Sequence, residues 1–342
     1  MKYITFTVPC YNSAKYMNHA IDTILTAGED VEIIIVDDGS TDDTGRIADA
    51  YAAEYPDIIR VIHKENGGHG SGVNTGIANA TGLYFKVVDS DDWVSEKSLK
   101  ELLCVIKAHV EKSVEADLYI TNYVYDHVLD NKKCVRHWKK QLPVNVFTDW
   151  ENVKPFFAAQ VMMMHSLLYK TELLRLSNTV LPEHTFYVDN IYAYKPLPYM
   201  KRIYYIDTNL YHYFIGRDDQ SVNINNMVKR YDQQVRVMCE MLKCYTFDEI
   251  TAMEPGLTKY MLHVVSAVMM VTMMFCCSGG DDEQRRRLYD QMWSDLQAQD
   301  LQMYEYLQHK GLPAIVTWMP WRVRGKSMLI GYKALCKIVK LG

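Results

Sequence analysis

Short apolar runs alternate with segments of helical periodicity over residues 1–125, and this alternation restricts the chain to few folds. The predicted strands are 3–8, 32–36, 58–63, 84–88 and 118–123. The predicted helices are 13–25, 42–54, 72–79 and 95–110, with Ser40, Thr41 and Ser95 as candidate N-terminal caps. Strands that alternate with helices are typical of a parallel sheet covered by helices. We therefore expect an α/β fold with a mostly parallel sheet.

The pattern changes in the rest of the chain. A basic stretch at 132–141 is followed by a segment of helical pattern at 165–177 and a Tyr-rich block at 186–214. From residue 226 onward the pattern is helical nearly throughout, interrupted by Pro and Gly clusters. We expect an α/β domain over 1–222 and a helical C-terminal region over 223–342.

Composition excludes several classes of protein. Hydrophobic residues make up 49% of the 342 residues and charged residues 23%, which is globular usage and excludes a disordered chain. The net charge of -5 argues against a nucleic-acid partner, because such binding depends on Lys and Arg at phosphates. The eight Cys form no Cys-x-x-Cys pair, and no secretory signal is apparent at the N-terminus. These features predict reduced thiols and a cytoplasmic location.

One apolar stretch, 260–277, reaches the lower limit of transmembrane length. It contains His263 and many Met residues, and Lys259 precedes it. These residues favour a helix packed inside a helical domain over a lipid-facing span.

A polar cluster follows each of the first four predicted strands. The clusters are 9–12, 37–40, 65–68 and 89–92. Ligands of open parallel sheets bind beyond the carboxyl ends of the strands, so these clusters predict one shared site. The chain has neither a Gly-x-Gly-x-x-Gly turn after the first strand nor a Gly-Lys-Ser/Thr loop, which excludes the common nucleotide motifs.

The carboxylates in these clusters cannot hold phosphates directly, because like charges repel. A divalent cation between them would make a diphosphate site. Asp89 and Asp91 stand two residues apart in an extended segment, so both carboxylates point to the same side. This spacing suits one hard cation.

Four runs in a fixed order give the chain a specific resemblance. VPCYN (8–12), VDDGSTDDT (36–44), NGGHGSGVNTG (66–76) and DSDDW (89–93) are similar to the motifs of family 2 glycosyltransferases, which have the GT-A fold. The resemblance covers residues 1–220. It implies transfer of a sugar from a nucleotide-diphosphate sugar, most often a UDP-sugar, to an acceptor hydroxyl with inversion, assisted by Mn²⁺ or Mg²⁺.

The resemblance also implies residue roles on the donor side. Pro9 and Tyr11 would flank the nucleobase, and Asp38, supported by Asp37, would accept the N3–H of a uracil. Asp89 and Asp91 would contact the ribose and the metal. The remaining donor-side residues would be Asp92 as a further metal ligand, Asn66 and Asn74 at turns beside the nucleotide sugar, and Arg217 as a clamp on the diphosphate.

On the acceptor side, the resemblance makes Asp189 the general base. The family usually has Glu before this Asp and Arg before the Asn of the Gly-rich loop, whereas this chain has Val188 and Val73. The Gln-x-x-Arg-Trp motif of processive synthases is absent, so transfer of one or a few sugars is expected. Family acceptors are often glycans or lipid-linked glycans of cell-surface polysaccharide or glycolipid synthesis.

The last segment, 318–342, has two Trp, six Lys or Arg and no acidic residue. Basic residues beside Trp and aliphatic side chains are typical of a helix that lies on an anionic membrane, which would make the protein peripheral at the cytoplasmic face. A solvated helix packed against its own domain is the alternative. For the whole chain, a nucleotidyltransferase and a non-catalytic nucleotide-sugar-binding module remain as alternative functions.

Overall fold

The computed structural model describes residues 1–127, 132–157, 160–216, 224–280 and 282–339. The chain forms two compact units, one of Met1–Val153 with Met162–Ile215 and the other of Lys154–Val161 with Gly216–Gly342. The expected boundary at 222/223 lies outside the described residues.

The first unit contains one mixed sheet with the strand order β3-β2-β1-β4-β9-β6-β10-β5. β1 pairs in parallel with β2 and β4, and β2 pairs in parallel with β3, as the strand pattern predicts. The strand bounds are β1 Ile4–Cys10, β2 Val31–Asp37, β3 Ile59–His63, β4 Tyr84–Val87, β5 Trp93–Val94, β6 Leu118–His127, β7 Lys132–Arg136, β8 Phe147–Thr148, β9 Leu167–Lys170 and β10 Ile203–Ile215.

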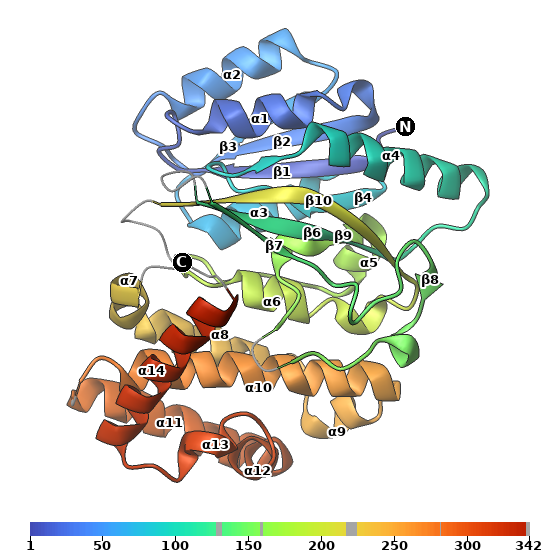
Figure 1. Ribbon diagram of the computed structural model, residues 1–342. Helices are drawn as coiled ribbons and strands as arrows, with labels where there is room; N and C mark the ends of the chain where they lie inside the picture. The colour runs from blue at the N-terminus through green and yellow to red at the C-terminus, as the bar shows by residue number, and fades with distance from the viewer. Residues whose placement is uncertain (128–131, 158–159, 217–223, 281, 340–342) are drawn as a thin grey trace. The chain divides into compact units, whose positions relative to one another are not determined.

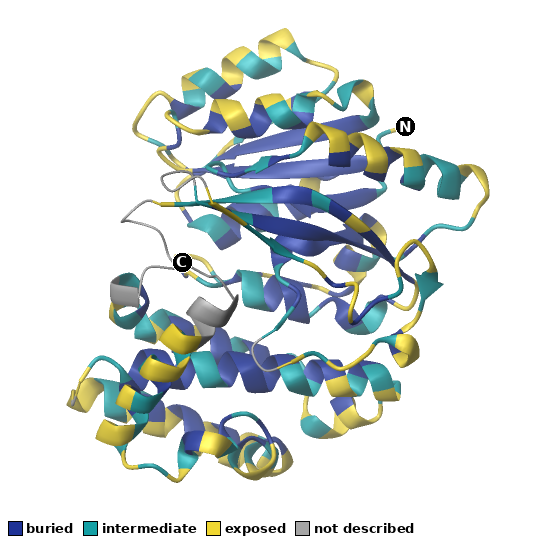
Figure 2. Cartoon of the chain, viewed as in Figure 1, coloured by how far each residue is buried: buried dark blue, intermediate teal, exposed yellow. Residues whose placement is uncertain are grey.

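Helices cover both faces of this sheet (Figure 1). α1 Met17–Leu25, α2 Thr44–Glu54 and α4 Glu96–Glu111 lie on one face, and α3 His69–Asn79 and α5 Thr171–Leu176 lie on the other. Every residue of β1 and β2 is consequently buried, which explains their continuous apolar runs (Figure 2). The side chain of Ser95 accepts a hydrogen bond from the Ser98 N–H, so the predicted cap of α4 is confirmed.

The segment 165–177 differs from the helix predicted for it. It forms a short 3-10 helix, Met164–Ser166, then strand β9 and only then α5. β9 pairs antiparallel with both β4 and β6, and its Leu167, Leu168 and Tyr169 are fully enclosed there. Packing between two strands therefore overrides the local helical preference. The Tyr-rich block contributes α6 Asp189–Tyr194 and β10.

The second unit is helical, as expected. Its helices are α7 Ile224–Lys229, α8 Tyr231–Leu242, α9 Phe247–Thr251, α10 Pro255–Cys277, α11 Glu283–Gln299, α12 Leu301–His309, α13 Ala314–Thr317 and α14 Trp321–Val339. α10 is central and contacts α8, α11 and α14. Among the described residues, α10 alone is long and apolar enough to cross a bilayer, with a mean hydropathy of 1.9 in its most apolar window. Of that window 78% is buried inside the structure, in agreement with the expected buried helix (Figure 2).

Candidate active site

The loops after β1, β2, β3 and β4 lie at the same edge of the sheet, because these strands are parallel. Side chains join the loops to one another. The Asn12 N–H donates to Ser40 Oγ at 3.0 Å, and Asn12 Oδ1 accepts from the Thr41 N–H at 2.8 Å. Ser13 Oγ and Ser90 Oγ are 2.7 Å apart and share a hydrogen bond. The predicted meeting of the polar clusters is thus present as a bonded network.

Asp38 holds the Gly-rich loop that follows β3. Its carboxylate accepts hydrogen bonds from the N–H groups of Gly67 at 3.0 Å and Gly68 at 2.7 Å, and Lys64 Nζ lies 2.8 Å from Oδ1. Asn66 Nδ2 donates to the Asp38 carbonyl at 2.9 Å. Asp38 is only 3% exposed, so its direct role here is to shape the loop.

Asp37 is linked to the next strand. Its carboxylate accepts from the Ser40 N–H at 3.1 Å and lies 2.9 Å from His63 Nδ1, while His63 Nε2 lies 3.1 Å from Asp49. Burial by itself would raise the pKa of Asp37, but hydrogen bonds from Ser40 and His63 outweigh it and lower the pKa below its ordinary value. Asp37 is therefore an ionised support beneath the loop after β2.

Asp89, at the carboxyl end of β4, is paired with His69. His69 begins α3, and its Nε2 lies 2.7 Å from Asp89 Oδ1. Burial acts to raise the pKa of Asp89, but the nearby His69 lowers it overall. Burial opposes the charged form of His69, yet the charges of Asp89, Asp189 and Asp91 raise its pKa. His69 therefore lies in the electrostatic field of the proposed metal ligands and the proposed base.

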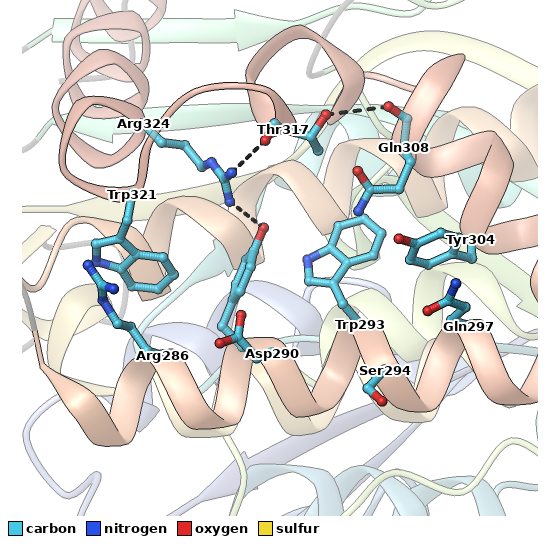
Figure 3. Close-up of a pocket in the computed structure, with 11 residues that line it drawn as sticks. Arg286, Asp290, Trp293, Ser294, Gln297, Tyr304, Gln308, Thr317, Trp321 and Arg324 are labelled. Atoms are coloured by element: carbon cyan, nitrogen blue, oxygen red, sulfur yellow. Dashed lines mark hydrogen bonds between the residues drawn. The ribbon is translucent and has the colours of Figure 1, made fainter.

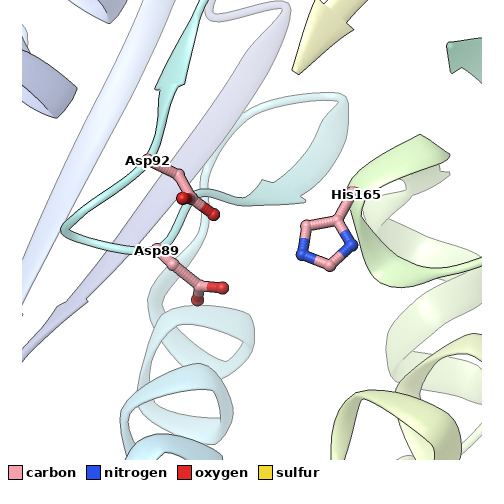
Figure 4. A group of neighbouring side chains, drawn as sticks. All are labelled: Asp89, Asp92 and His165. Atoms are coloured by element: carbon pink, nitrogen blue, oxygen red, sulfur yellow. The ribbon is translucent and has the colours of Figure 1, made fainter. Parts of the chain in front are cut away.

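The Asp92 N–H donates to the Asp89 carbonyl at 3.0 Å, and Asp92 is 1% exposed. It accepts hydrogen bonds from the Tyr211 hydroxyl at 2.6 Å and from the Phe214 N–H at 2.8 Å, both on β10. Burial, with the charges of Asp91 and Asp89, raises the pKa of Asp92 well above its ordinary value. Asp89, Asp92 and His165 each offer a ligand atom, and these atoms lie within 4.8 Å of one another (Figure 4).

The donor set of this cluster fits a divalent cation. His165 Nδ1 is buried and has no hydrogen-bond partner among the described residues. Burial lowers the pKa of His165 to about 4, so its imidazole is neutral at pH 7, the form that ligates metals. Two carboxylates with one imidazole suit Mn²⁺. Within the described chain, Asp91 lies outside this three-residue group but near enough to act on the pKa of Asp92.

Lys86 positions His165. Lys86 is fully enclosed in β4, and its Nζ donates to the carbonyl of His165 at 2.7 Å. Nζ also lies 5.4 Å from the centre of the Tyr211 ring. Burial lowers the pKa of Lys86 to about 7, with the charge of Asp89 opposing that shift. This hydrogen bond accounts for a buried Lys in a central strand, where sequence alone predicts an apolar residue.

Asp189 is the first residue of α6, and the chain before it is fastened to α3. The Asn74 side chain donates to the Leu181 carbonyl at 2.8 Å and accepts from the Leu181 N–H at 2.9 Å. The His184 N–H donates to the Gly67 carbonyl at 2.7 Å. Burial raises the pKa of Asp189 to about 6, partly opposed by the charge of His69.

The other predicted residues take different positions. Pro9 is buried, and a Cβ on Gly72 would lie 2.9 Å from its Cβ, so Pro9 packs on α3. Tyr11 is 54% exposed at the same edge and is available to a ligand. Arg217 lies outside the described residues.

Comparison with known proteins identifies related chains. Residues 5–169 match the family model for glycosyl transferase family 2. Glycosyltransferase GlyG of Streptococcus pneumoniae is 42% identical over 122 residues, which are 35% of this chain and 38% of that protein. Glycosyltransferase GlyA of the same organism is 28% identical over 231 residues, which are 64% of this chain and 31% of that protein. The matches thus span 38% and 31% of the lengths of these two relatives.

Solved structures share the fold. TarS 1–349 of S. aureus in complex with UDP-GlcNAc has a TM-score of 0.64 at 18% identity, covering 97% of this chain and 92% of that chain. Mannosyltransferase PcManGT from Pyrobaculum calidifontis, in complex with GDP-Man and Mn²⁺, has a TM-score of 0.51 at 15% identity, covering 95% of this chain and 86% of that chain.

The mixed sheet, its flanking helices and the helical C-terminal unit are thus a GT-A-like glycosyltransferase fold. Residues 5–169 thus match glycosyl transferase family 2, in agreement with the resemblance seen in the motifs.

Proposed function

We propose that this protein transfers a sugar from a nucleotide-diphosphate sugar, with UDP as the favoured nucleotide, to a hydroxyl group of an acceptor. The observation that carries the proposal is the pairing of Asp89 with His69 at the carboxyl ends of the parallel strands. Asp189 lies near enough for the charges of both residues to act on its pKa. The UDP-GlcNAc in the TarS complex and the GDP-Man in the PcManGT complex support a nucleotide-sugar donor.

The proposed reaction is a single displacement with inversion. The acceptor oxygen forms a bond to the anomeric carbon while the bond from that carbon to the diphosphate oxygen breaks. The electron pair leaves with the nucleoside diphosphate, and the acceptor proton passes to the Asp189 carboxylate. A pKa of about 6 leaves Asp189 largely ionised at pH 7 while keeping it more basic than an exposed Asp.

Asp89, Asp91, Asp92 and His165 are the residues that would hold Mn²⁺ or Mg²⁺. When bound, such a cation offsets the negative charge of a departing diphosphate. The Mn²⁺ in the PcManGT complex supports this proposal. On the nucleotide side, exposed Tyr11 is proposed to stack on the base, and Asp37, Asp38, Asn66 and Asn74 to hold the surrounding loops, while Pro9 packs beneath them.

Titration calorimetry with UDP, with and without Mn²⁺, tests the donor proposal. We expect binding that depends on the metal, because the carboxylates at this edge repel a diphosphate on their own. GDP and the other nucleoside diphosphates serve as comparison ligands. If no nucleoside diphosphate binds under either condition, the proposed function is wrong. A nucleotidyltransferase would instead require a nucleoside triphosphate and release pyrophosphate, which a product assay distinguishes.

We further propose that the acceptor is a glycan or lipid-linked glycan of cell-surface polysaccharide or glycolipid synthesis, reached at the cytoplasmic face of a membrane. The support is an exposed surface of the second unit. Ile315, Trp318, Val323 and Ile330 are all more than half exposed there. Arg322, Lys326 and Lys333 are exposed on α14 as well. Aliphatic and Trp side chains beside basic residues are suited to an anionic lipid surface.

Charge reversal tests this membrane surface better than deletion of the tail. α14 packs on α10, and a Cβ on Gly325 would lie 2.1 Å from the Cys277 carbonyl, so removing α14 would disturb the unit itself. Replacing Arg322, Lys326 and Lys333 by Glu leaves that packing intact. At ~1 kcal/mol per basic residue near an anionic surface, we expect sedimentation with phosphatidylglycerol vesicles to fall at least tenfold. Unchanged sedimentation, or none with the unaltered protein, would contradict the proposal.

A further inference from the structure

A pocket of about 460 Å³ lies within the helical unit, between α11, α12 and α14 (Figure 3). Its volume is inside the ~300–1,000 Å³ range typical of small-molecule sites. Aromatic rings and uncharged polar side chains dominate its lining. The proposed transfer reaction uses none of these residues.

One face of α11 forms a wall of the pocket. Tyr289, Trp293 and Gln297 follow one another at four-residue spacing, which places them on the same side of the helix. The Tyr289 and Trp293 ring centres are 6.3 Å apart, and Trp293 and Tyr304 of α12 are 5.8 Å apart and nearly perpendicular. Trp321 of α14 extends this row, with its ring 5.2 Å from Tyr289. One side of the pocket thus holds a row of four aromatic rings that pack edge to face.

Amide groups stand beside these rings. In Figure 3 the Gln308 side chain points toward the space between Trp293 and Tyr304, and Gln297 lies below Tyr304. Each amide offers both a donor and an acceptor. Gln308 is half-buried and Gln297 is exposed, so the two groups differ in depth. A ligand that fits must present an apolar face to the rings and alternating hydroxyl donors and acceptors to the amides.

The charged groups of the pocket are Arg286, Arg324 and Asp290, and both guanidinium groups already have partners within the protein. Arg324 donates to the Tyr289 hydroxyl at 2.7 Å and to the Met319 carbonyl at 2.9 Å, so its guanidinium is already hydrogen-bonded within the protein. The Arg286 guanidinium stands 5.3 Å from the centre of the Trp321 ring. Asp290 adds a negative charge to the lining. A phosphate in the pocket would be repelled by the Asp290 carboxylate and would have to compete with the Tyr289 hydroxyl and the Met319 carbonyl for Arg324.

We propose that this pocket binds a saccharide unit of an uncharged glycan. A pyranose ring has an apolar face of C–H groups and a rim of hydroxyls, which match the aromatic row and the two amides. The class of ligand follows from the lining alone. That the pocket retains the acceptor or product glycan rests on the proposed transferase function.

Saturation-transfer NMR on the full chain, without nucleotide sugar, tests this inference. The probes are glucose, galactose, N-acetylglucosamine and their β-1,4-linked disaccharides, with inorganic phosphate as the anionic probe. We expect at least one saccharide to bind with millimolar affinity and phosphate not to compete with it. Gln308→Ala and Gln297→Ala should each weaken that binding about tenfold, the loss expected for a hydrogen bond of ~1.4 kcal/mol.

A matched variant makes the result specific. Trp318→Ala removes a Trp of the same unit that is 74% exposed and outside the pocket lining, and it should bind saccharide as the unaltered protein does. Saccharide binding that is absent, unaffected by both Gln variants, or displaced by phosphate would overturn the inference. Because no nucleotide is present, failure of UDP binding would leave this result standing.

Discussion

Asp189→Asn is expected to lower the turnover number by about 10²–10⁴-fold, the contribution typical of a positioned general base. The amide keeps the shape of the side chain but cannot accept the acceptor proton. Donor binding should persist, because Asp189 belongs to α6 and not to the loops after β1, β2 and β4. Release of nucleoside diphosphate measures turnover, and calorimetry with UDP and Mn²⁺ measures binding. Full turnover in this variant would show that another group takes the proton.

The pH dependence of activity is a second test of Asp189 as the general base. Burial raises the pKa of Asp189 to about 6, and a base works only when deprotonated. Activity should therefore be full above this value and fall tenfold per pH unit below it. A surface Asp would keep activity down to pH 4. An acidic limb near pH 4 in kcat/KM would contradict the assignment of Asp189 as the base.

Asp89→Asn is expected to weaken metal-dependent UDP binding by about 100-fold or more, since loss of an outer-shell partner alone costs 10–100-fold in metal affinity. Asp89 is a proposed ligand, the partner of His69 at 2.7 Å and a source of charge on Asp189. UDP binding is measured across a Mn²⁺ titration.

Asp91→Asn is the matched comparison for that experiment, because Asp91 is also a proposed ligand of the ion but lies outside the three-residue cluster. A larger loss with Asp89→Asn than with Asp91→Asn would support the cluster of Asp89, Asp92 and His165 as the main part of the metal site, with Asp91 as a weaker ligand. Metal-dependent binding that survives Asp89→Asn would contradict it. Circular dichroism checks that each variant retains its fold.

The sequence was sufficient to predict the carboxyl edge but not the full site. Strand ends in a parallel sheet are fixed by local pattern, so Asp37, Asp38 and Asp89 could be placed together from residue spacing alone. His165 could not be placed, because it precedes β9 and reaches the sheet only where β9 pairs. The partners of β9 are β4 and β6, which both lie far from it in the sequence.

The same limit applies to Lys86 and His69. Lys86 stands at a position where the strand pattern predicts an apolar side chain, and its partner, the His165 carbonyl, is 79 residues away. His69 begins a helix three residues earlier than the predicted 72–79, and that extra turn brings its ring to Asp89. Long-range pairing and helix ends are the two features that local patterns specify least.

The two hydrogen bonds between the Asn74 side chain and the Leu181 backbone have a consequence for engineering this chain. Both bonds join residues 107 positions apart. They connect α3, which follows the Gly-rich loop, to the segment that precedes Asp189. A chimera that exchanges 178–188 for the equivalent segment of a relative therefore replaces Leu181 and its surroundings but keeps the Asn74 that bonds to it. Donor recognition and proton acceptance would have to be transplanted together, as one module, for a hybrid enzyme to keep both.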